Sequence, residues 1–291
     1  MKWQGRRQSS NVEDARSAPS RGSARGGGGL GLLMTIGRVF GWKGILVAVV
    51  VGGALWKMGV DPSLLLSGGG AGAPQAEVSS DDQMRFDFVK VVLADTEDVW
   101  TAEFARLGKT YELPTMKVYR GQVNTACGNG NAAMGPFYCP GDRKVYIDLG
   151  FYDELAQTFN SPGDFAQAYV IAHEVGHHVQ KLLGVSDKVS ALHGRPDYNE
   201  ASVRLELQAD FYAGVWANHS RKYLEHGDIE EAMRAANAIG DDAIQKKAQG
   251  RVVPHSFTHG TSEQRMRWFK KGLTSGRIED GDTFSMPYRN L

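Results

Sequence analysis

The chain has 291 residues, and its 33 Lys and Arg side chains balance 33 Asp and Glu side chains, so the formal net charge at pH 7 is zero. This balance argues against a nucleic-acid-binding protein built on a broad basic surface. The two cysteines, Cys127 and Cys139, are too few for a small disulfide scaffold or for a cluster of zinc fingers.

The charge and the glycines are unevenly distributed. Residues 1–43 carry eight basic and two acidic side chains, a net charge of +6, so the remaining residues carry −6. Seventeen of the 36 glycines lie in residues 1–74, and glycine adds no side chain to a core while losing the most backbone entropy on ordering. We therefore predict that residues 1–38 are a disordered basic tail and that residues 80–291 are the folded domain.

An apolar segment separates these two parts. Its unbroken uncharged run is Gly44–Trp56, and a bilayer-spanning helix needs about 20 residues, a length reached if Lys43 and Lys57 extend their charged ends to the two interfaces. We predict a transmembrane helix over residues 39–60. Two alternatives stay open: a signal peptide cleaved near Ala71-Gly72-Ala73, and a buried element of the domain.

The charge asymmetry predicts a topology for this helix. By the positive-inside rule the basic tail stays in the cytoplasm, and everything after residue 60 lies outside. The expected location is the inner membrane, single-pass, with a periplasmic or extracellular domain. Residues 61–79, rich in Gly, Ala and Pro, are expected to form a flexible linker.

Apolar periodicity and turn residues predict an α+β domain after this linker. The expected elements are a helix over Phe86–Leu107, strands over Met116–Tyr119 and Lys144–Leu149, a helix opened by Ser161–Asp164 and ended by Gly184, and a helix over Glu200–Asn218.

The helix that Gly184 ends contains His173-Glu174-Val175-Gly176-His177, the HExxH zinc motif. Residues four apart lie on one helix face, so both imidazoles can reach one Zn²⁺ at about 2.0–2.1 Å. Glu174 is rotated from His173 by about 100°, which places it beside the metal, where it can take a proton from water. We predict one zinc ion, with His173 and His177 as ligands and Glu174 as the general base. His178 lies off this face and is not expected to be a ligand.

A catalytic zinc needs a third protein ligand and an open position. The metzincin pattern requires glycine at position 180 and histidine at position 183, whereas this chain has Gln180 and Leu183. We therefore predict Glu206, from the later helix, as the third ligand, with Glu200 as an alternative. Asp210, four residues after Glu206, is predicted to accept the free N–H of a zinc-binding histidine.

HEVGHH followed by RLELQAD resembles the bacterial family of predicted neutral zinc metallopeptidases. The opening WQGRRQSSNVEDAR, the segment CGNGNAAMGPFYCPGDRKVYIDLGFYDEL and the late FTHGTSEQRMRWF resemble that family too, so the resemblance spans nearly the whole chain. It implies a zincin-like α+β metallopeptidase domain, with an active-site helix and a small sheet, of gluzincin type.

The ELQAD element is also similar to the membrane metallopeptidases of the CAAX-protease and heat-shock type. In those proteins the Glu of E-x-x-x-D binds zinc, which maps onto Glu206, and the Asp maps onto Asp210. Their late His-Pro…Arg element corresponds to His259-Gly260…Arg265, with glycine in place of proline. The resemblance makes His259 a candidate catalytic residue that stabilises the transition state, and the alternative is a histidine satisfied in a surface loop.

Cys127 and Cys139 lie in a Gly-rich stretch. Outside the cytoplasm an intradomain disulfide is the expected state. The alternatives are free buried thiols and metal ligation by one cysteine, as in HExxH hydrolases of the deformylase type, which would displace Glu206.

These features together predict a membrane-anchored zinc peptidase, with an endopeptidase favoured over an exopeptidase, acting on a peptide or protein substrate and not on nucleic acid. An extended substrate is expected to pair with a sheet edge, and Lys144–Leu149 is the candidate edge strand, although an internal strand is an equal alternative. Two other functions compete: an anchored, catalytically silent zinc-binding or assembly factor, and a deformylase-like amide hydrolase.

Overall fold

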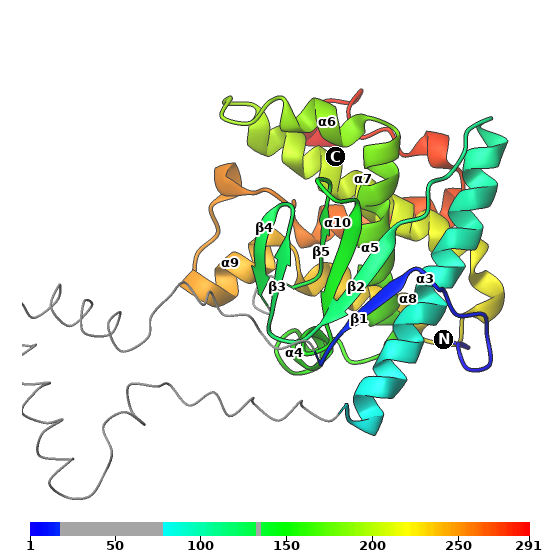
Figure 1. Cartoon of the computed structure of the whole chain (residues 1–291). Coiled ribbons are helices and arrows are strands. Elements are labelled where there is room, and N and C mark those ends of the chain that lie inside the picture. The colour runs from blue at the N-terminus through cyan, green and yellow to red at the C-terminus, as the bar shows by residue number, and fades with distance from the viewer. Residues whose placement is uncertain (18–77, 132–134) are drawn as a thin grey trace, which may run out of the picture. The chain divides into compact units, whose positions relative to one another are not determined.

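The computed structural model describes residues 1–17, 78–131 and 135–291, which form an α+β arrangement of eight α-helices and two small sheets (Figure 1). The α+β class was therefore predicted correctly. The predicted transmembrane helix over residues 39–60 lies outside the described residues, as does nearly all of the predicted linker.

The larger sheet has four strands in the order β1-β2-β6-β5. β1, β2 and β6 are parallel to one another, while β5 is antiparallel to β6. A hairpin forms the second sheet. The strands are β1 (Val12–Ala15), β2 (Thr115–Tyr119), β3 (Gln122–Thr125), β4 (Gly128–Asn131), β5 (Phe137–Cys139) and β6 (Lys144–Asp148).

The position of β6 corrects one expectation. The segment proposed as the edge strand, Lys144–Leu149, forms β6, which is hydrogen-bonded to β2 on one side and to β5 on the other. Its side chains Val145 and Ile147 are fully buried, as expected for the centre of a sheet. The edge on this side is β5, a three-residue strand that the sequence analysis did not identify.

The helices form a layer against the sheet, with α5 and α7 at its centre (Figure 1). Helix α5 contacts β5 and β6, while α10 packs on α7 and α8. The helices are α3 (Ser80–Arg106), α4 (Phe151–Gln157), α5 (Asp164–Leu182), α6 (Val185–Ser190), α7 (Tyr198–His219), α8 (Asp228–Ala238), α9 (Asp241–Gln249) and α10 (Ser262–Ser275).

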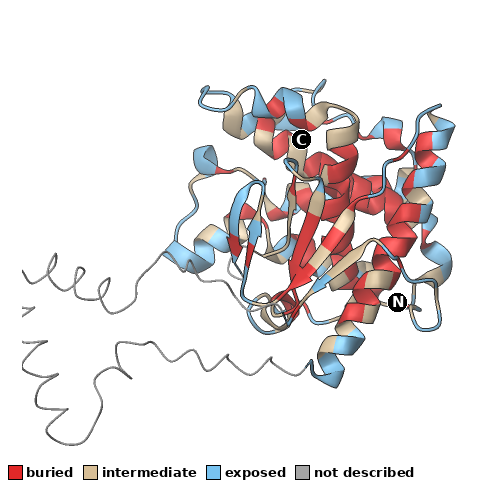
Figure 2. Cartoon of the chain, in the orientation of Figure 1, coloured by how far each residue is buried: buried red, intermediate tan, exposed pale blue. Residues whose placement is uncertain are grey.

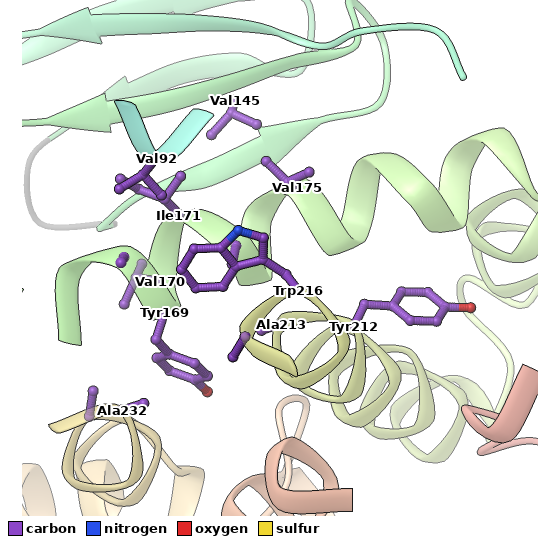
Figure 3. Packing of buried hydrophobic residues seen from close by; sticks show 14 of the residues in the cluster. Val92, Val145, Tyr169, Val170, Ile171, Val175, Tyr212, Ala213, Trp216 and Ala232 are labelled. Atoms are coloured by element: carbon purple, nitrogen blue, oxygen red, sulfur yellow. The ribbon is translucent and has the colours of Figure 1, made fainter. Parts of the chain in front are cut away.

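Buried residues are concentrated where α5 and α7 face each other and the sheet (Figure 2). Trp216 of α7 is fully buried and stacks on Phe165 of α5, with ring centroids 5.6 Å apart. Side chains from α3, α5 and β6 surround this indole, among them Val92, Ile171 and Val145 (Figure 3). This packing makes α5 and α7 a rigid support for the side chains that they carry on their other faces.

The start of α5 differs in detail from the prediction. The helix begins at Asp164, and Ser161 does not cap it. Instead, Glu231 of α8 accepts the backbone N–H of Phe165 at 3.1 Å. Gly163, with φ of 133°, leaves room for that carboxylate, because a Cβ at this position would lie 2.2 Å from it. The predicted end is confirmed, since Gly184 follows the helix in the left-handed conformation, with φ of 76°.

Residues 1–16 fold with the domain, contrary to this part of the predicted disordered tail, whose residues 18–38 lie outside the described residues. β1 pairs with β2 in parallel, with Val12 opposite Met116. The basic side chains expected to be solvated instead form ion pairs, mostly with acidic residues of α3. The pairs join Arg6 to Asp95, Arg7 to Glu97 and Asp98, and Arg16 to Asp14. Composition alone did not predict this, because the acidic partners of Arg6 and Arg7 lie some 90 residues further along the chain.

The predicted single-pass membrane architecture is wrong. No helix within the described ranges is long and apolar enough to cross a membrane. In addition, residues 1–16 and 78–291 form one compact unit, joined by the β1–β2 pairing. Residues 1–16 and 78–291 therefore lie on the same side of any membrane. This excludes the expected topology of a cytoplasmic N terminus and an exported domain.

Candidate metal centre

The HExxH motif lies in the middle of α5 and faces a cavity. The rings of His173 and His177 have centroids 4.8 Å apart, and metal-binding atoms of His173, Glu174 and His177 all lie within 4.8 Å of one another. Spacing of four residues on a helix brings the two imidazoles to one side, as predicted.

Glu206 of α7 completes this group. Its Oε2 lies 3.2 Å from His173 Nε2, and its Oε1 lies 3.5 Å from His177 Nε2. The carboxylate therefore faces both of the nitrogens that would bind a metal. The alternative ligand Glu200 instead forms an ion pair with Arg204 at 3.0 Å.

The two helices can approach this closely because a glycine lies between them. A Cβ on Gly176 would lie 3.1 Å from the carbonyl oxygen of Ala209 and 3.2 Å from its Cα. Gly176 is the second variable position of HEVGH, and Ala209 lies three residues after Glu206. Small residues at this crossing thus bring the carboxylate of α7 to the imidazoles of α5.

Asp210, fully buried, lies at the centre of a polar network behind His173. Its Oδ1 is 2.8 Å from His173 Nδ1 and 2.5 Å from the hydroxyl of Tyr169. Arg265 of α10 binds the same carboxylate through Nε (2.8 Å) and Nη2 (3.0 Å). Because a carboxylate can only accept, Nδ1 of His173 carries a proton, and Nε2 is the ring nitrogen left to bind a metal ion.

His177 is oriented in the same way by a different residue. Its Nδ1 lies 2.9 Å from Oε1 of the buried Gln180. The amide nitrogen of Gln180 donates to Leu205 O at 2.7 Å, which fixes the oxygen on the histidine side. Nδ1 of His177 is therefore a donor, and its Nε2 is the nitrogen left to bind a metal ion.

Tyr169 and Gln180 were not predicted as part of the site. Tyr169 precedes His173 by four residues and Gln180 follows His177 by three, so both lie on the motif's face of the helix. That spacing was visible in the sequence. What it did not show was that Gln180 would accept from Nδ1 of His177 and that Tyr169 would donate to Asp210.

The charges of the site are strongly coupled in the metal-free protein. Burial lowers the pKa of His173, but the charge of Asp210 and the hydrogen bond to it outweigh burial and raise that pKa to about 10. Burial raises the pKa of Glu206, but the two histidines hold it well below its ordinary value. Burial raises the pKa of Glu174, more than the adjacent histidines lower it. Glu174 is thus a better proton acceptor than an exposed carboxylate.

The cavity beside these residues has a volume of about 570 Å³. Residues of α4, α5, α6, α7, α9, α10 and β5 line it, together with residues that flank β5, residues that follow α4 and α8, and His259 before α10. His173, Glu174, His177, Glu206, His259 and Arg265 line it together with apolar side chains that include Phe137, Phe151, Phe159, Val170, Ile239 and Ile244. The structure therefore brings the predicted HExxH residues, Glu206 and His259 to one cavity.

The two cysteines are not part of the metal centre. Cys127, in the turn of the β3–β4 hairpin, forms a disulfide with Cys139 of β5, and their Cα atoms are 5.8 Å apart. A disulfide sulfur is not a thiolate ligand, and neither cysteine lines the cavity. The deformylase-like alternative therefore loses its proposed ligand.

His178, next to the motif, links α5 to the edge strand. Its Nδ1 lies 3.0 Å from the hydroxyl of Tyr138 on β5, and its Nε2 lies 2.6 Å from Glu112 O. The backbone carbonyl can only accept, so Nε2 carries the proton, and Nδ1 accepts from Tyr138. This contact fixes β5 relative to the two histidines.

A Tyr138→Phe substitution is expected to lower the free energy of unfolding by about 1–3 kcal/mol, because it leaves the buried Nδ1 of His178 without a donor. Urea unfolding of the metal-free protein measures this change, and zinc content should stay the same. Wild-type stability in the variant would show that Tyr138 does not hold β5 to α5.

Two imidazole Nε2 atoms and one carboxylate, with an open cavity on one side and a free glutamate beside them, are a donor set that suits catalytic zinc. Fold and site thus define an HExxH metallohydrolase class of protein. Residues 1–284 match the family described as "Putative neutral zinc metallopeptidase", and the chain belongs to this family. The resemblance inferred from the sequence is therefore confirmed, and membership implies zinc and a peptide or protein substrate.

Similar proteins come from distant bacteria. "Uncharacterized protein YpfJ" of Escherichia coli (strain K12) is 49% identical over 291 residues, which covers 98% of this chain and 99% of that protein. "Uncharacterized protein Rv2575" of Mycobacterium tuberculosis (strain ATCC 25618 / H37Rv) is 42% identical over 211 residues, covering 68% of this chain and 71% of that protein. No solved structure matches the chain.

Proposed function

We propose that this protein is a zinc-dependent peptidase that hydrolyses extended peptides, with His173, His177 and Glu206 holding the zinc ion. The observation that supports it most directly is the position of Glu206, whose two oxygens face the Nε2 atoms of both histidines at 3.2 and 3.5 Å. Asp210 and Gln180 would fix the two imidazoles from behind.

Bound zinc supplies a Lewis acid that polarises the scissile carbonyl and lowers the pKa of water from 15.7 to about 7. Glu174 takes a proton from the attacking water as its oxygen bonds to the carbonyl carbon. Glu174 then gives that proton to the amine nitrogen as the C–N bond breaks. His259 donates a hydrogen bond to the carbonyl oxygen while it carries negative charge.

The edge strand β5 offers a backbone for the substrate. Phe137 and Tyr138 line the cavity, and β6 occupies only one side of their strand. An extended peptide can pair with the other side, which gives affinity without sequence preference. This replaces β6 in that role.

Side-chain preference would come from the apolar end of the cavity. Phe151, Phe159, Val170, Ile239 and Ile244 line the cavity, and Val170 lies one turn before His173 on α5. Ile244 is 41% exposed, although large apolar side chains are usually covered. We therefore propose substrates with a bulky apolar residue next to the cleaved bond, since apolar walls select apolar groups.

The test uses the purified full chain, stripped of metal by a chelator and reloaded with zinc. A library of quenched fluorescent peptides is expected to be cleaved only by the zinc-loaded protein, with bulky apolar residues enriched beside the cleaved bond. Ile244→Asp should lower kcat/KM for the best peptide about 10-fold or more. Val252→Asp is the matched control, because Val252 is also 41% exposed but does not line the cavity.

Two outcomes contradict the proposal. A zinc-loaded protein that leaves every peptide intact would favour the silent binding or assembly factor. Equal losses of kcat/KM in Ile244→Asp and Val252→Asp would show that Ile244 does not contact the substrate.

A further inference from the structure

Asp241, the first residue of α9, forms hydrogen bonds with the loop that carries His259. Its Oδ2 accepts three successive backbone N–H groups, those of Thr258 (2.7 Å), His259 (2.7 Å) and Gly260 (3.1 Å). Its own N–H donates to Gly260 O at 2.9 Å. Asp241 is only 8% exposed, so these contacts are shielded from competing water.

The second oxygen of Asp241 is left for the imidazole. Oδ1 lies 3.2 Å from His259 Nδ1, and the hydroxyl of Thr258 lies 3.0 Å from the same nitrogen. A carboxylate accepts and cannot donate, so Nδ1 of His259 carries a proton. The opposite nitrogen, Nε2, makes no hydrogen bond within the described part of the chain, and His259 lines the cavity.

The neighbouring acid has a different task. Asp242 accepts from the backbone N–H and the hydroxyl of Ser262, both at 2.7 Å, and so holds the start of α10. Between Asp242 and His259 the structure has neither a hydrogen bond nor an ion pair. Asp242 therefore anchors the start of α10, while Asp241 orients the imidazole of His259.

We propose that Asp241 is a positioning residue, which holds His259 with its Nε2–H directed to the carbonyl oxygen of the substrate in the cavity. The proposal rests on the proposed function. His259 is half exposed, with 52% of its side chain accessible, so a substrate can reach it, while the loop that carries it is held at three successive amides.

The surrounding charges favour the same role. The hydrogen bond to Asp241 of α9 and the charge of Glu206 of α7 raise the pKa of His259, and burial and Arg265 of α10 lower it, with a raised pKa as the result. A cationic imidazole is a stronger donor to a developing oxyanion than a neutral one.

The test compares Asp241→Asn with Asp242→Asn in the zinc-loaded full chain. Asparagine keeps one oxygen for the loop amides but loses the charge and one acceptor. For Asp241→Asn we expect kcat to fall by up to about 10²–10³-fold, the loss seen when an oxyanion donor is removed. KM should change little, and the alkaline limb of kcat/KM should move to lower pH. Asp242→Asn should leave the pH profile unchanged.

A second readout does not need activity. The imidazole pKa of His259, followed by NMR with labelled histidine, should be lower in Asp241→Asn than in the wild type and unmoved in Asp242→Asn. An unmoved pKa and an unshifted pH profile in Asp241→Asn overturn the proposal. If the wild type cleaves no peptide, the proposed function fails, yet the titration still decides whether Asp241 controls the imidazole.

Discussion

Replacing Glu174 with glutamine is expected to lower kcat/KM for peptide cleavage about 10²–10⁴-fold, the usual contribution of a general acid–base residue. Glutamine has nearly the same shape but cannot take a proton from the attacking water. Zinc content should stay at about one ion per chain. The three protein ligands of such a site remain, because Glu174 lies beside them and is not one of them. Initial rates and metal analysis on the same preparation measure both quantities.

Glu154→Gln is the matched control. Glu154 also lines the cavity, so the two variants each neutralise one cavity carboxylate, and only the Glu174 variant should lose hydrolysis. Activity that survives in Glu174→Gln would assign the base to another residue. Loss of zinc in that variant would instead make Glu174 a ligand. Metal analysis tests this, because a carboxylate oxygen of Glu174 lies within 4.8 Å of the histidine donor atoms.

Replacing Arg265 with methionine is expected to have the largest effect on stability. The guanidinium is 3% exposed and binds both oxygens of Asp210, which is fully buried. Removing one partner leaves a buried charge uncompensated, which costs about 3–5 kcal/mol. Zinc affinity should also fall about 10–100-fold, because Asp210 orients His173. Urea unfolding of the metal-free protein and zinc competition with a chelator measure the two effects.

Arg267→Met, on the exposed side of the same helix, is the control and should change stability by less than about 0.5 kcal/mol. If Arg265→Met fails to fold, the double variant Asp210→Asn/Arg265→Met, which removes both charges, should recover part of the stability. Equal stability of the Arg265 and Arg267 variants would show that Asp210 does not depend on the guanidinium.

The pairing of Asp210 with Arg265 also makes the stability of the metal-free protein depend on pH. Burial raises the pKa of Asp210, but Arg265 and His173 outweigh it and lower that pKa from the ordinary 3.8 to about 2. A depressed pKa in the folded state means stability that is present above about pH 4 and is lost as the pH falls towards 2. Arg265→Met should flatten this loss in the metal-free protein, measured as unfolding free energy against pH.

Local sequence signals predicted the elements that carry the metal centre. Helix α5 carries the HExxH face at the expected residues, and α7 spans Tyr198–His219 against an expected Glu200–Asn218. Both have long apolar faces, for which periodicity is a strong signal. β5, with three residues, is too short for such a signal, so the sequence predicts the sheet edge at β6 instead. Contacts such as the one between Arg265 and Asp210 could not be predicted without knowing which helices pack together.

The sequence by itself determined the chemistry on one helix: His173, Glu174 and His177 share a face because a helix turns once in 3.6 residues. The sequence also predicted Glu206 as their partner, but only the tertiary structure decided that Arg265 holds Asp210 and that Asp241 holds His259, because these residues come from helices that meet through packing. The uneven distribution of charge predicts a basic tail separated from an acidic domain. The structure instead pairs Arg6 and Arg7 with acids of α3 in one folded unit, because ion pairs depend on distance in space, which counting charges along a chain does not reveal.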